Sequence, residues 1–496
     1  MRAVIIGAGI AGLSAALRLR KLGWQTLLVE KAPSRRGGGY GVTFGGIGYD
    51  GAENLGILSA LRDKEFVTSE LVYRKVDGRR RFAMNGATIA ATMGEKSFGI
   101  LRGDIESVLY EAVRDHAEFR FGTTVTAIDQ DDDTVYATLS DGSIEAADLL
   151  IGADGLHSAT RALVFGPEDG YRLDLDHKVA VFMLKNRPAE LREGETGSIS
   201  EGGRTFAMMS VGDGRTSAFF GYRTDVDGAD TDEGPETVLP RLYGDMAWLV
   251  PQALAELKTA DSVYFDSISQ MVVDRWSHGR VVLLGDAAWC VTLFAGYGSS
   301  LAVGGADLLG SAIERHPGDI PAALAEWETQ LRPETERKQK MGRRVKGVYA
   351  PRNKFVLELT QLPLRLASSA PVRRYMQRKL QVQGLRNPWV YSSISARNAD
   401  FDASSMKDTS TAFFASEATP STSRSSSRTA TAYSLLRSVP NIGGSSLLIV
   451  TVTPAATISR IGCSSSDSTA RVARLDVGHT SSGMSLSARC RSSFSS

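Results

Sequence analysis

The first thirty residues constrain the fold more than any other part of the chain. An apolar strand, Val4-Ile5-Ile6, is followed by glycines at 7, 9 and 12, an apolar-faced helix, and a second strand that ends at Glu30. In a G-x-G-x-x-G turn, the first glycine allows a tight turn, the second lets backbone approach a pyrophosphate, and the third lets the helix pack on the strand. The helix N-terminus offers unpaired N–H groups to phosphates. The pattern therefore predicts a dinucleotide site, with Glu30 as the ligand of a ribose.

The overall charge gives no case for nucleic acid or an anionic membrane as the main partner. The 57 basic and 56 acidic residues leave a net charge of +1, whereas binding to such polyanions requires an excess of positive charge. Cys290, Cys463 and Cys490 lie far apart without a CxxC pair, and the six histidines show no metal spacing. We therefore expect no metal site and no disulfide framework. No apolar run reaches membrane-spanning length, and we expect a cytoplasmic protein.

The middle of the chain alternates between helical and β-rich regions. Residues 66–97 and about 176–274 carry short strand patterns, and Ile144–Ile151 reads as one strand. Val281-Val282-Leu283-Leu284 is fully apolar, as in a buried parallel sheet. We expect Asp104 to cap a helix. The expected helices are 52–62, 104–116, 234–258, one from about 299, 322–348 and 363–380.

The composition changes near the C-terminus. Residues 401–496 contain 26 serines and no periodic apolar pattern apart from Leu447–Val450. Such a segment lacks a core that could offset the loss of chain entropy on folding. It is either a flexible interaction tail or sequence from a shifted reading frame. We favour the second interpretation and assign no structure there.

Three motifs in a fixed order resemble the group A flavoprotein monooxygenases, of the p-hydroxybenzoate hydroxylase and tetracycline hydroxylase type. They are the glycine turn with Glu30, Asp154-Gly155 within Ile151–Ser158, and Gly285-Asp286-Ala287-Ala288. Arg102 matches an arginine before the family's middle helix, and Asp274-Arg275-Trp276 matches the approach to the Gly-Asp strand. The resemblance covers roughly residues 1–330.

The resemblance implies an α/β fold with a Rossmann-like FAD-binding domain of the glutathione-reductase type. An interleaved β-rich substrate domain and C-terminal helices complete it. The expected boundaries are 1–70, 98–175 and 275–325 for the FAD domain, 71–97 and 176–274 for the substrate domain, 326–396 for the helices, and 397–496 for a disordered tail. The residues expected to bind FAD are Gly7, Gly9, Ala11, Gly12, Glu30, Lys31, Arg102, Asp154, Gly155, Gly285, Asp286, Gly296, Gly298 and Ser299.

The activity that the resemblance implies is hydroxylation of a small aromatic or polycyclic molecule. FAD is expected to be noncovalent, with NADPH or NADH as electron donor and O2 reacting to give a flavin C4a-hydroperoxide. Residues 294–300 are expected beneath the flavin ring, where the following helix start favours negative charge. Asp154 is expected to serve both FAD and NAD(P)H. The chain has no second G-x-G-x-x-G with strand context, and no catalytic residue is assigned.

Two departures from the family pattern keep alternatives open. The chain has Trp289 where the family usually has His, and Leu293 where it has Pro. Trp289 is as readily explained by packing. Cys290 has no basic neighbour in the sequence to activate a thiolate, so we expect it to be inert. Capping a helix also explains Asp286, and this role is compatible with contact to the cofactor. An FAD-dependent reductase or dehydrogenase of the same fold, which does not use oxygen, is the main alternative. A non-catalytic flavin-binding protein is another, while the W-x-W-x-I-P motif of flavin halogenases is absent.

Overall fold

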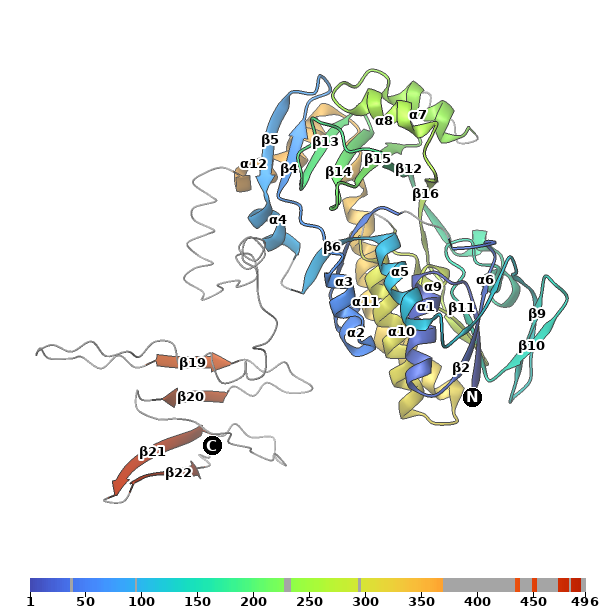
Figure 1. Cartoon of the computed structure of the whole chain (residues 1–496), viewed down its shortest axis with the longest axis vertical. Coiled ribbons are helices and arrows are strands. Elements are labelled where there is room, and N and C mark those ends of the chain that lie inside the picture. Colours follow the sequence, from blue (N-terminus) through green and yellow to red (C-terminus); the bar gives the residue numbers. More distant parts are fainter. Residues whose placement is uncertain are drawn as a thin grey trace, which may run out of the picture. The chain divides into compact units, whose positions relative to one another are not determined.

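The computed structural model describes residues 1–35, 39–93, 96–226, 233–292 and 296–368, and four strands beyond residue 430. By its internal contacts the chain divides into two units, residues 1–387 and 388–496. The first unit contains both large sheets, and these position the site (Figure 1).

A six-stranded sheet forms the centre of one lobe. Its order is β17-β18-β11-β1-β2-β7, and every pair is parallel except β17 with β18. The strands are β1 (Arg2–Ile6), β2 (Gln25–Glu30), β7 (Glu118–Phe121), β11 (Leu149–Gly152), β17 (Ser277–His278) and β18 (Val281–Leu283). The central strands β1, β11 and β18 are buried on both faces, which explains their continuous apolar sequences.

Alternate residues of β1 enter two different cores. Ala3 and Ile5 pack with three helices, whereas Val4 and Ile6 pack against an antiparallel three-stranded sheet on the other face. The helices are α1 (Ile10–Lys21), α5 (Arg102–Val113) and α10 (Gly298–Arg315). The opposite layer contains β8 (Val125–Gln130), β9 (Val135–Leu139), β10 (Ile144–Ala147) and α6 (Ala159–Val164).

A seven-stranded sheet forms the second lobe, in the order β16-β12-β15-β14-β13-β4-β5. Its strands are β4 (Glu70–Arg74), β5 (Arg80–Asn85), β12 (Arg172–Leu184), β13 (Glu195–Glu201), β14 (Arg204–Ser210), β15 (Thr216–Arg223) and β16 (Val263–Met271). Helices α7 (Pro235–Tyr243) and α8 (Val250–Leu257) cover one face. The strands come from residues 70–85 and 172–271, close to the two segments predicted for the substrate domain.

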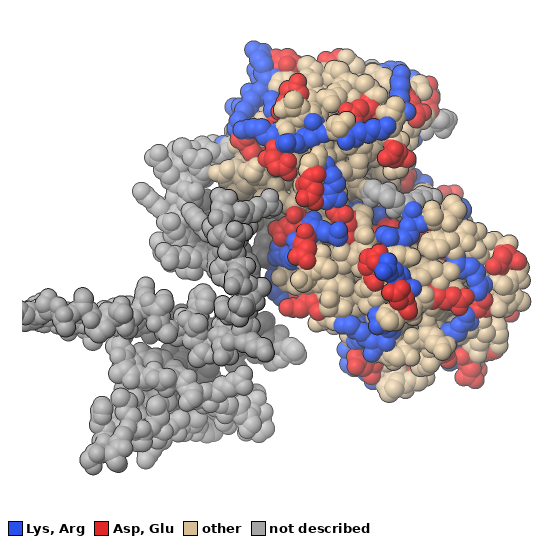
Figure 2. Space-filling view, viewed as in Figure 1, with Lys and Arg blue, Asp and Glu red and all other residues tan. Residues whose placement is uncertain are grey.

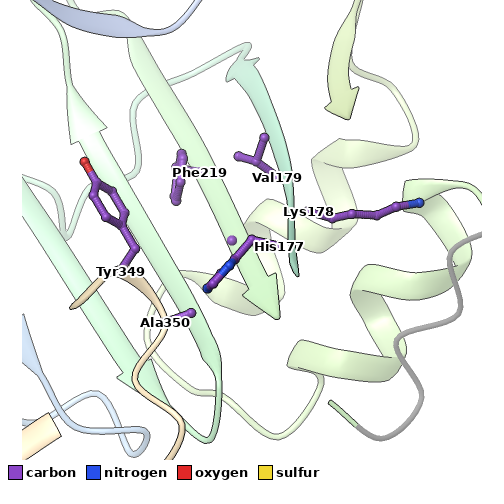
Figure 3. Close-up of a pocket in the computed structure, with 7 residues that line it drawn as sticks. His177, Lys178, Val179, Phe219, Tyr349 and Ala350 are labelled. Carbon is purple, nitrogen blue, oxygen red and sulfur yellow. The ribbon is translucent and has the colours of Figure 1, made fainter. Parts of the chain in front are cut away.

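The opposite face of this sheet is apolar and aromatic. Val179, Val181 and Ile268 cluster there, with Phe219 and Tyr40 packed against them. A narrow pocket on this face has no space for a water molecule, so we assign no ligand to it (Figure 3). It is lined by His177, Lys178, Val179, Phe219, Gly221, Tyr349 and Ala350.

The long helix α11 (Ile320–Tyr349) serves both lobes. Trp327 and Leu331 are buried in the core of the six-stranded sheet, while Tyr349 lines the pocket on the seven-stranded sheet. The remaining elements are α2 (Ile47–Leu55), α3 (Leu58–Arg62), α4 (Gly86–Met93), α9 (Asp286–Trp289), α12 (Lys354–Ser368), the 3-10 helix η1 (Glu168–Gly170), β3 (Gly41–Gly45) and β6 (Ser97–Leu101).

Several predicted elements were wrong in their bounds. The helix expected at 52–62 is α2 and α3, separated at Gly56, which has a φ of +76°. The helix expected at 234–258 is likewise two helices, with Trp248 at a φ of +61° between them. Asp104 does not cap α5, which begins two residues earlier at Arg102. Instead, an Asp104 oxygen pairs with Arg215 Nη2 at 3.0 Å.

The strand expected at Ile144–Ile151 is also divided, because β10 and β11 belong to different sheets. Asp148, between them, accepts a hydrogen bond from the backbone N–H of Arg2 at 2.6 Å. The helix expected at 363–380 begins earlier, as α12 at Lys354, and the part after residue 368 lies outside the described residues.

The second unit contains two antiparallel strand pairs where the sequence pattern predicted no structure. They are β19 (Tyr433–Arg437) with β20 (Leu448–Val452), and β21 (Val472–Thr480) with β22 (Gly483–Arg491). The apolar run Leu447–Val450 overlaps β20. The rest of the tail lies outside the described residues, so its disorder stays a prediction.

Among the described residues, no three metal-ligating side chains gather in one place. No described helix combines the length and apolar character that crossing a bilayer requires. On the face shown in Figure 2, basic and acidic side chains are interspersed. This distribution agrees with the nearly balanced charge of the sequence.

Three tryptophans pack together in the core of the lobe that contains the six-stranded sheet. Trp276, Trp289 and Trp327 are all buried, and the rings of Trp276 and Trp289 have centroids 4.7 Å apart. Trp327 lies 5.9 Å from Trp289 and donates its indole N–H to the Gly305 carbonyl at 2.8 Å. At the position where the family usually has His, Trp289 is therefore a packing residue.

Trp289→Ala should lower the free energy of unfolding by about 3–5 kcal/mol, because it opens a cavity among large side chains. Urea denaturation of the purified protein measures the change. Phe355→Ala is the control, since Phe355 is 75% exposed and its loss should change stability by less than about 0.5 kcal/mol. Equal effects of the two substitutions would contradict the packing role.

Candidate cofactor site

The glycine turn between β1 and α1 has little room for side chains. Gly7 has a φ of +104°, and a Cβ placed on it would lie 2.4 Å from the carbonyl oxygen of Ala153. A Cβ on Gly12 would lie 1.9 Å from the carbonyl oxygen of Gly7. Gly9 differs, because the nearest described atom to its Cβ position is Arg102 Nη2 at 4.0 Å. Gly9 therefore borders an open space at the N-terminus of α1.

The Glu30 carboxylate lies at the mouth of this turn. It accepts the backbone N–H of Ala8 at 2.9 Å and that of Ala32 at 2.8 Å. A carboxylate has about four acceptor positions, so Glu30 can also accept a hydrogen bond from a ribose hydroxyl. Lys31 follows it with an exposed side chain. Glu30, which the sequence pattern predicts to bind a ribose, therefore also stabilises the glycine turn through these hydrogen bonds.

Arg102 places a positive charge beside the turn. It is the first residue of α5, and its backbone N–H donates to the Tyr40 carbonyl at 2.9 Å. Its guanidinium Nη1 donates to Glu106 Oε2 at 3.2 Å. Burial raises the pKa of Glu106, while the charges of Arg102 and Arg35 oppose that shift. An arginine so placed can bind phosphate oxygens.

Asp286 enters from the other half of the sheet. Gly285, with a φ of +69°, ends the turn after β18, and Asp286 begins α9 rather than capping it. Its side chain is exposed to solvent. Even so, desolvation by the surrounding protein raises its pKa, and the charge of Arg102 opposes the shift. Such a carboxyl suits a cleft that holds a polar ligand.

The start of α10 lies next to Asp286. A Cβ on Gly298, the first residue of α10, would be 3.7 Å from Asp286 Oδ1. Gly296 has a φ of +59°, and Ser299 lies in the first turn of the helix. A Cβ on Gly285 would meet Ala11 on α1 at 2.8 Å. The turns that start α1, α9 and α10 therefore converge.

The FAD binding domain family matches residues 1–316, which is more than half of the chain. The chain belongs to this family.

Relatives and solved structures agree with this assignment. A flavin-dependent monooxygenase from an unidentified prokaryote is 30% identical over 343 residues, covering 68% of this chain and 88% of the relative. Tetracycline destructase Tet(51) has a TM-score of 0.62 and 27% identity, covering 74% of this chain and 97% of its own. Klebsiella pneumoniae HpxO, solved with FAD and uric acid, has a TM-score of 0.63 and 26% identity, covering 74% and 92%. This chain is a group A flavin-dependent monooxygenase, and its cofactor is FAD.

The geometry of this monooxygenase fits such a cofactor. Gly9 borders an open space, Arg102 supplies a positive charge beside it, and the carboxyl of Asp286 lies close enough to Arg102 to interact with that charge. The individual contacts of the fourteen predicted residues with FAD stay predictions.

Asp154 is less available than the sequence suggested. Its Oδ1 accepts the Ser158 hydroxyl at 2.5 Å, and its Oδ2 accepts the Thr160 N–H at 2.9 Å. The carboxylate therefore orders the turn before α6, in which Gly155 has a φ of +82°. The predicted contact of Asp154 with FAD and NAD(P)H would have to use the acceptor positions that these hydrogen bonds leave free.

Part of the predicted flavin loop lies outside the described residues, including Leu293 and residues 294–295. Cys290 is buried, and desolvation raises the pKa of its thiol well above the usual value. This shift agrees with the inert role expected from its sequence context.

Sequence reasoning missed three residues at this site. Glu106 accepts a hydrogen bond from Arg102 and is opposite to it in charge. Tyr40 lies close enough to Arg102 and Asp286 for both charges to affect the pKa of its phenol. Tyr264, on β16, has its ring centroid 5.7 Å from that of Tyr40. Glu106 could have been found as the residue four positions after Arg102 on a helix. The tyrosines belong to no motif, so only the fold brings them together.

Gly9→Val should abolish FAD binding while the protein still folds, because its side chain would occupy the open space at the start of α1. Fluorescence titration with FAD measures the affinity, and thermal unfolding checks the fold. Gly170→Val is the matched control, since a Cβ at Gly170 meets no described atom within 4 Å. Normal FAD content in the Gly9 variant would contradict the site.

Asp286→Asn should stabilise the FAD-free protein at neutral pH. The raised pKa means that Asp286 favours folding below its unfolded value of 3.8 and that this contribution is lost as pH rises through the folded value. The stability difference between variant and wild type should therefore grow across that interval. Urea denaturation from pH 3.5 to 7.5 measures it. Asp213→Asn, with a side chain 89% exposed, should show no such growth.

Proposed function

We propose that this monooxygenase uses NAD(P)H and O2 to hydroxylate a small, planar aromatic or polycyclic substrate. The observation that carries the proposal is the aromatic and apolar sheet face beside the cofactor site. Tyr40 links the two, because it contacts the Val179–Val181–Ile268 cluster and lies near Arg102 and Asp286. Planar apolar rings bind well against such a surface.

The two tyrosines add polar groups to an otherwise apolar wall. Burial raises the pKa of Tyr40 to about 12. Tyr264 is 42% exposed, and desolvation of the rest of its side chain raises its pKa as well. Both phenols therefore stay protonated near neutral pH and can donate hydrogen bonds. A substrate with hydroxyl or carbonyl groups on an aromatic ring satisfies both the apolar wall and these donors. The relatives that act on tetracycline and bind uric acid are consistent with this class.

In the proposed reaction, different parts of the chain bind the cofactor, stabilise charge near the flavin ring and orient the substrate. When bound, FAD supplies two-electron redox chemistry and reaction with O2. The α1 turn and Arg102 bind and orient its phosphates, and the start of α10 favours negative charge near the ring. The sheet face orients the substrate and excludes water. The described residues contain no second dinucleotide turn of the Gly7–Gly12 type, which supports transient use of NAD(P)H.

The deciding experiment supplies purified protein with NADPH or NADH, ¹⁸O2 and a panel of hydroxylated aromatics that includes tetracycline and uric acid. We expect substrate-stimulated consumption of the nicotinamide and one labelled oxygen atom per product molecule. Reduced product without label, while the nicotinamide is consumed, would favour the reductase alternative and overturn the proposal.

Tyr264→Ala should raise KM about tenfold with a smaller effect on kcat, since it removes part of the substrate wall. Steady-state kinetics on the best substrate measures both constants. Tyr136→Ala is the control, because Tyr136 is similarly exposed but lies on β9 of the small three-stranded sheet. An unchanged KM in the Tyr264 variant would place the substrate elsewhere.

A further inference from the structure

The segment that ends α9 and follows it, residues 289–292, is held by buried polar side chains. Gln270 on β16 and Gln339 on α11 are 0% and 6% exposed. Buried amides of this kind are costly unless hydrogen-bonded, so their partners indicate what they are for.

Both amides donate to the segment that leaves α9. Gln339 Nε2 donates to the carbonyl of Trp289 at 3.1 Å, and Gln270 Nε2 donates to that of Val291 at 3.2 Å. The carbonyl between them, on Cys290, accepts the backbone N–H of Met271 at 3.2 Å. Three successive carbonyls are thus fixed to β16 and α11.

The two glutamines are themselves held in place. Gln270 Nε2 also donates to the Gln339 carbonyl at 2.9 Å, and its Oε1 accepts Arg343 Nη1 at 2.5 Å. Gln339 Nε2 also donates to the Met271 carbonyl at 2.7 Å. The amide groups therefore have fixed orientations, and the network joins the two lobes of the first unit.

The next residue, Thr292, has a φ of +79°, which is rare for a β-branched residue. Such strain persists only where the surroundings enforce it. Here α11 packs closely on this residue, because a Cβ on Gly342 would lie 2.7 Å from Thr292 Cγ2. On the far side of the connection, Lys338 Nζ lies 3.4 Å from the centroid of the Tyr297 ring. One stretch of α11 therefore contacts both sides.

We propose that Gln270 and Gln339 are positioning residues that set the spacing between Asp286 on α9 and the start of α10. This inference rests on the proposed function. Both elements belong to the cofactor site, and an error of about 1 Å in the placement of reacting groups can cost about 100-fold in rate. Loosening the segment should therefore divert reducing equivalents from product to peroxide while FAD still binds.

The experiment compares FAD-loaded Gln339→Met with wild type. Hydrogen exchange followed by mass spectrometry should show at least tenfold faster exchange in a peptide covering residues 289–292. Hydroxylated product per NAD(P)H should fall at least threefold, KM should change less than kcat, and the dissociation constant of FAD should change by less than threefold. Gln361→Met is the matched control, because Gln361 is also 6% exposed but accepts a hydrogen bond from Arg81 on β5.

A second variant keeps the test open if Gln339→Met does not fold. Gly342→Ala keeps both glutamines, but its Cβ would lie 2.7 Å from Thr292 Cγ2, 3.0 Å from the Val291 carbonyl oxygen and 3.2 Å from Gln270 Nε2. It therefore crowds the same segment and should shift the same two measurements. Exchange no faster than in Gln361→Met would overturn the proposal. Faster exchange with unchanged coupling would also overturn it, leaving only a structural role.

Failure of the proposed function has a different signature. In that case wild type itself would give no labelled product, and the exchange rates together with the visible circular dichroism of bound FAD decide the positioning role. Faster exchange with an altered FAD spectrum in Gln339→Met, and neither in Gln361→Met, would still support it. Unchanged values of both would overturn it.

Discussion

The cofactor site depends on how closely α1 approaches β1. The Cβ position of Gly12 lies within 1.9 Å of the Gly7 carbonyl oxygen, and that of Gly7 lies within 2.4 Å of the Ala153 carbonyl oxygen. Any side chain at either position would move the helix away from the sheet. The N-terminus of α1 would then no longer point at the space that Gly9 leaves open. The absence of side chains at Gly7 and Gly12 is therefore what directs the N–H groups and the positive end of the helix dipole toward that space.

This dependence explains why a candidate cofactor site could be located from sequence. The turn with glycines 7, 9 and 12, and the positions of Glu30 and Asp286, depend on backbone geometry, and their spacing along the chain remains visible as a motif. Their contacts with FAD stay predictions. The strand before the glycine turn, β1, and the strand before Asp286, β18, are largely apolar runs, and Glu30 ends β2 between them in the sequence. The same reasoning failed where chain geometry depends on partners from elsewhere. Asp104 looks like a helix cap but pairs with Arg215 in the turn between β14 and β15.

The substrate side could not be predicted for a related reason. Tyr40 lies in a loop and Tyr264 on a strand more than two hundred residues later, and only the packing of the two lobes brings their rings within 5.7 Å. The glutamines of the α9–α10 connection are equally hidden, because an isolated Gln on a helix usually faces solvent. Their meaning comes from the carbonyls they reach on other elements.

Helix α11 contacts both the candidate cofactor site and the sheet face proposed to bind the substrate. Its first half packs in the core of the six-stranded sheet, its middle bonds to the segment after α9, and its end lines the seven-stranded sheet. Backbone geometry shapes the candidate cofactor site, whereas in the proposed function side chains on the sheet face select the substrate. Substitutions on that face would then change which molecule is bound without disturbing the glycine turns.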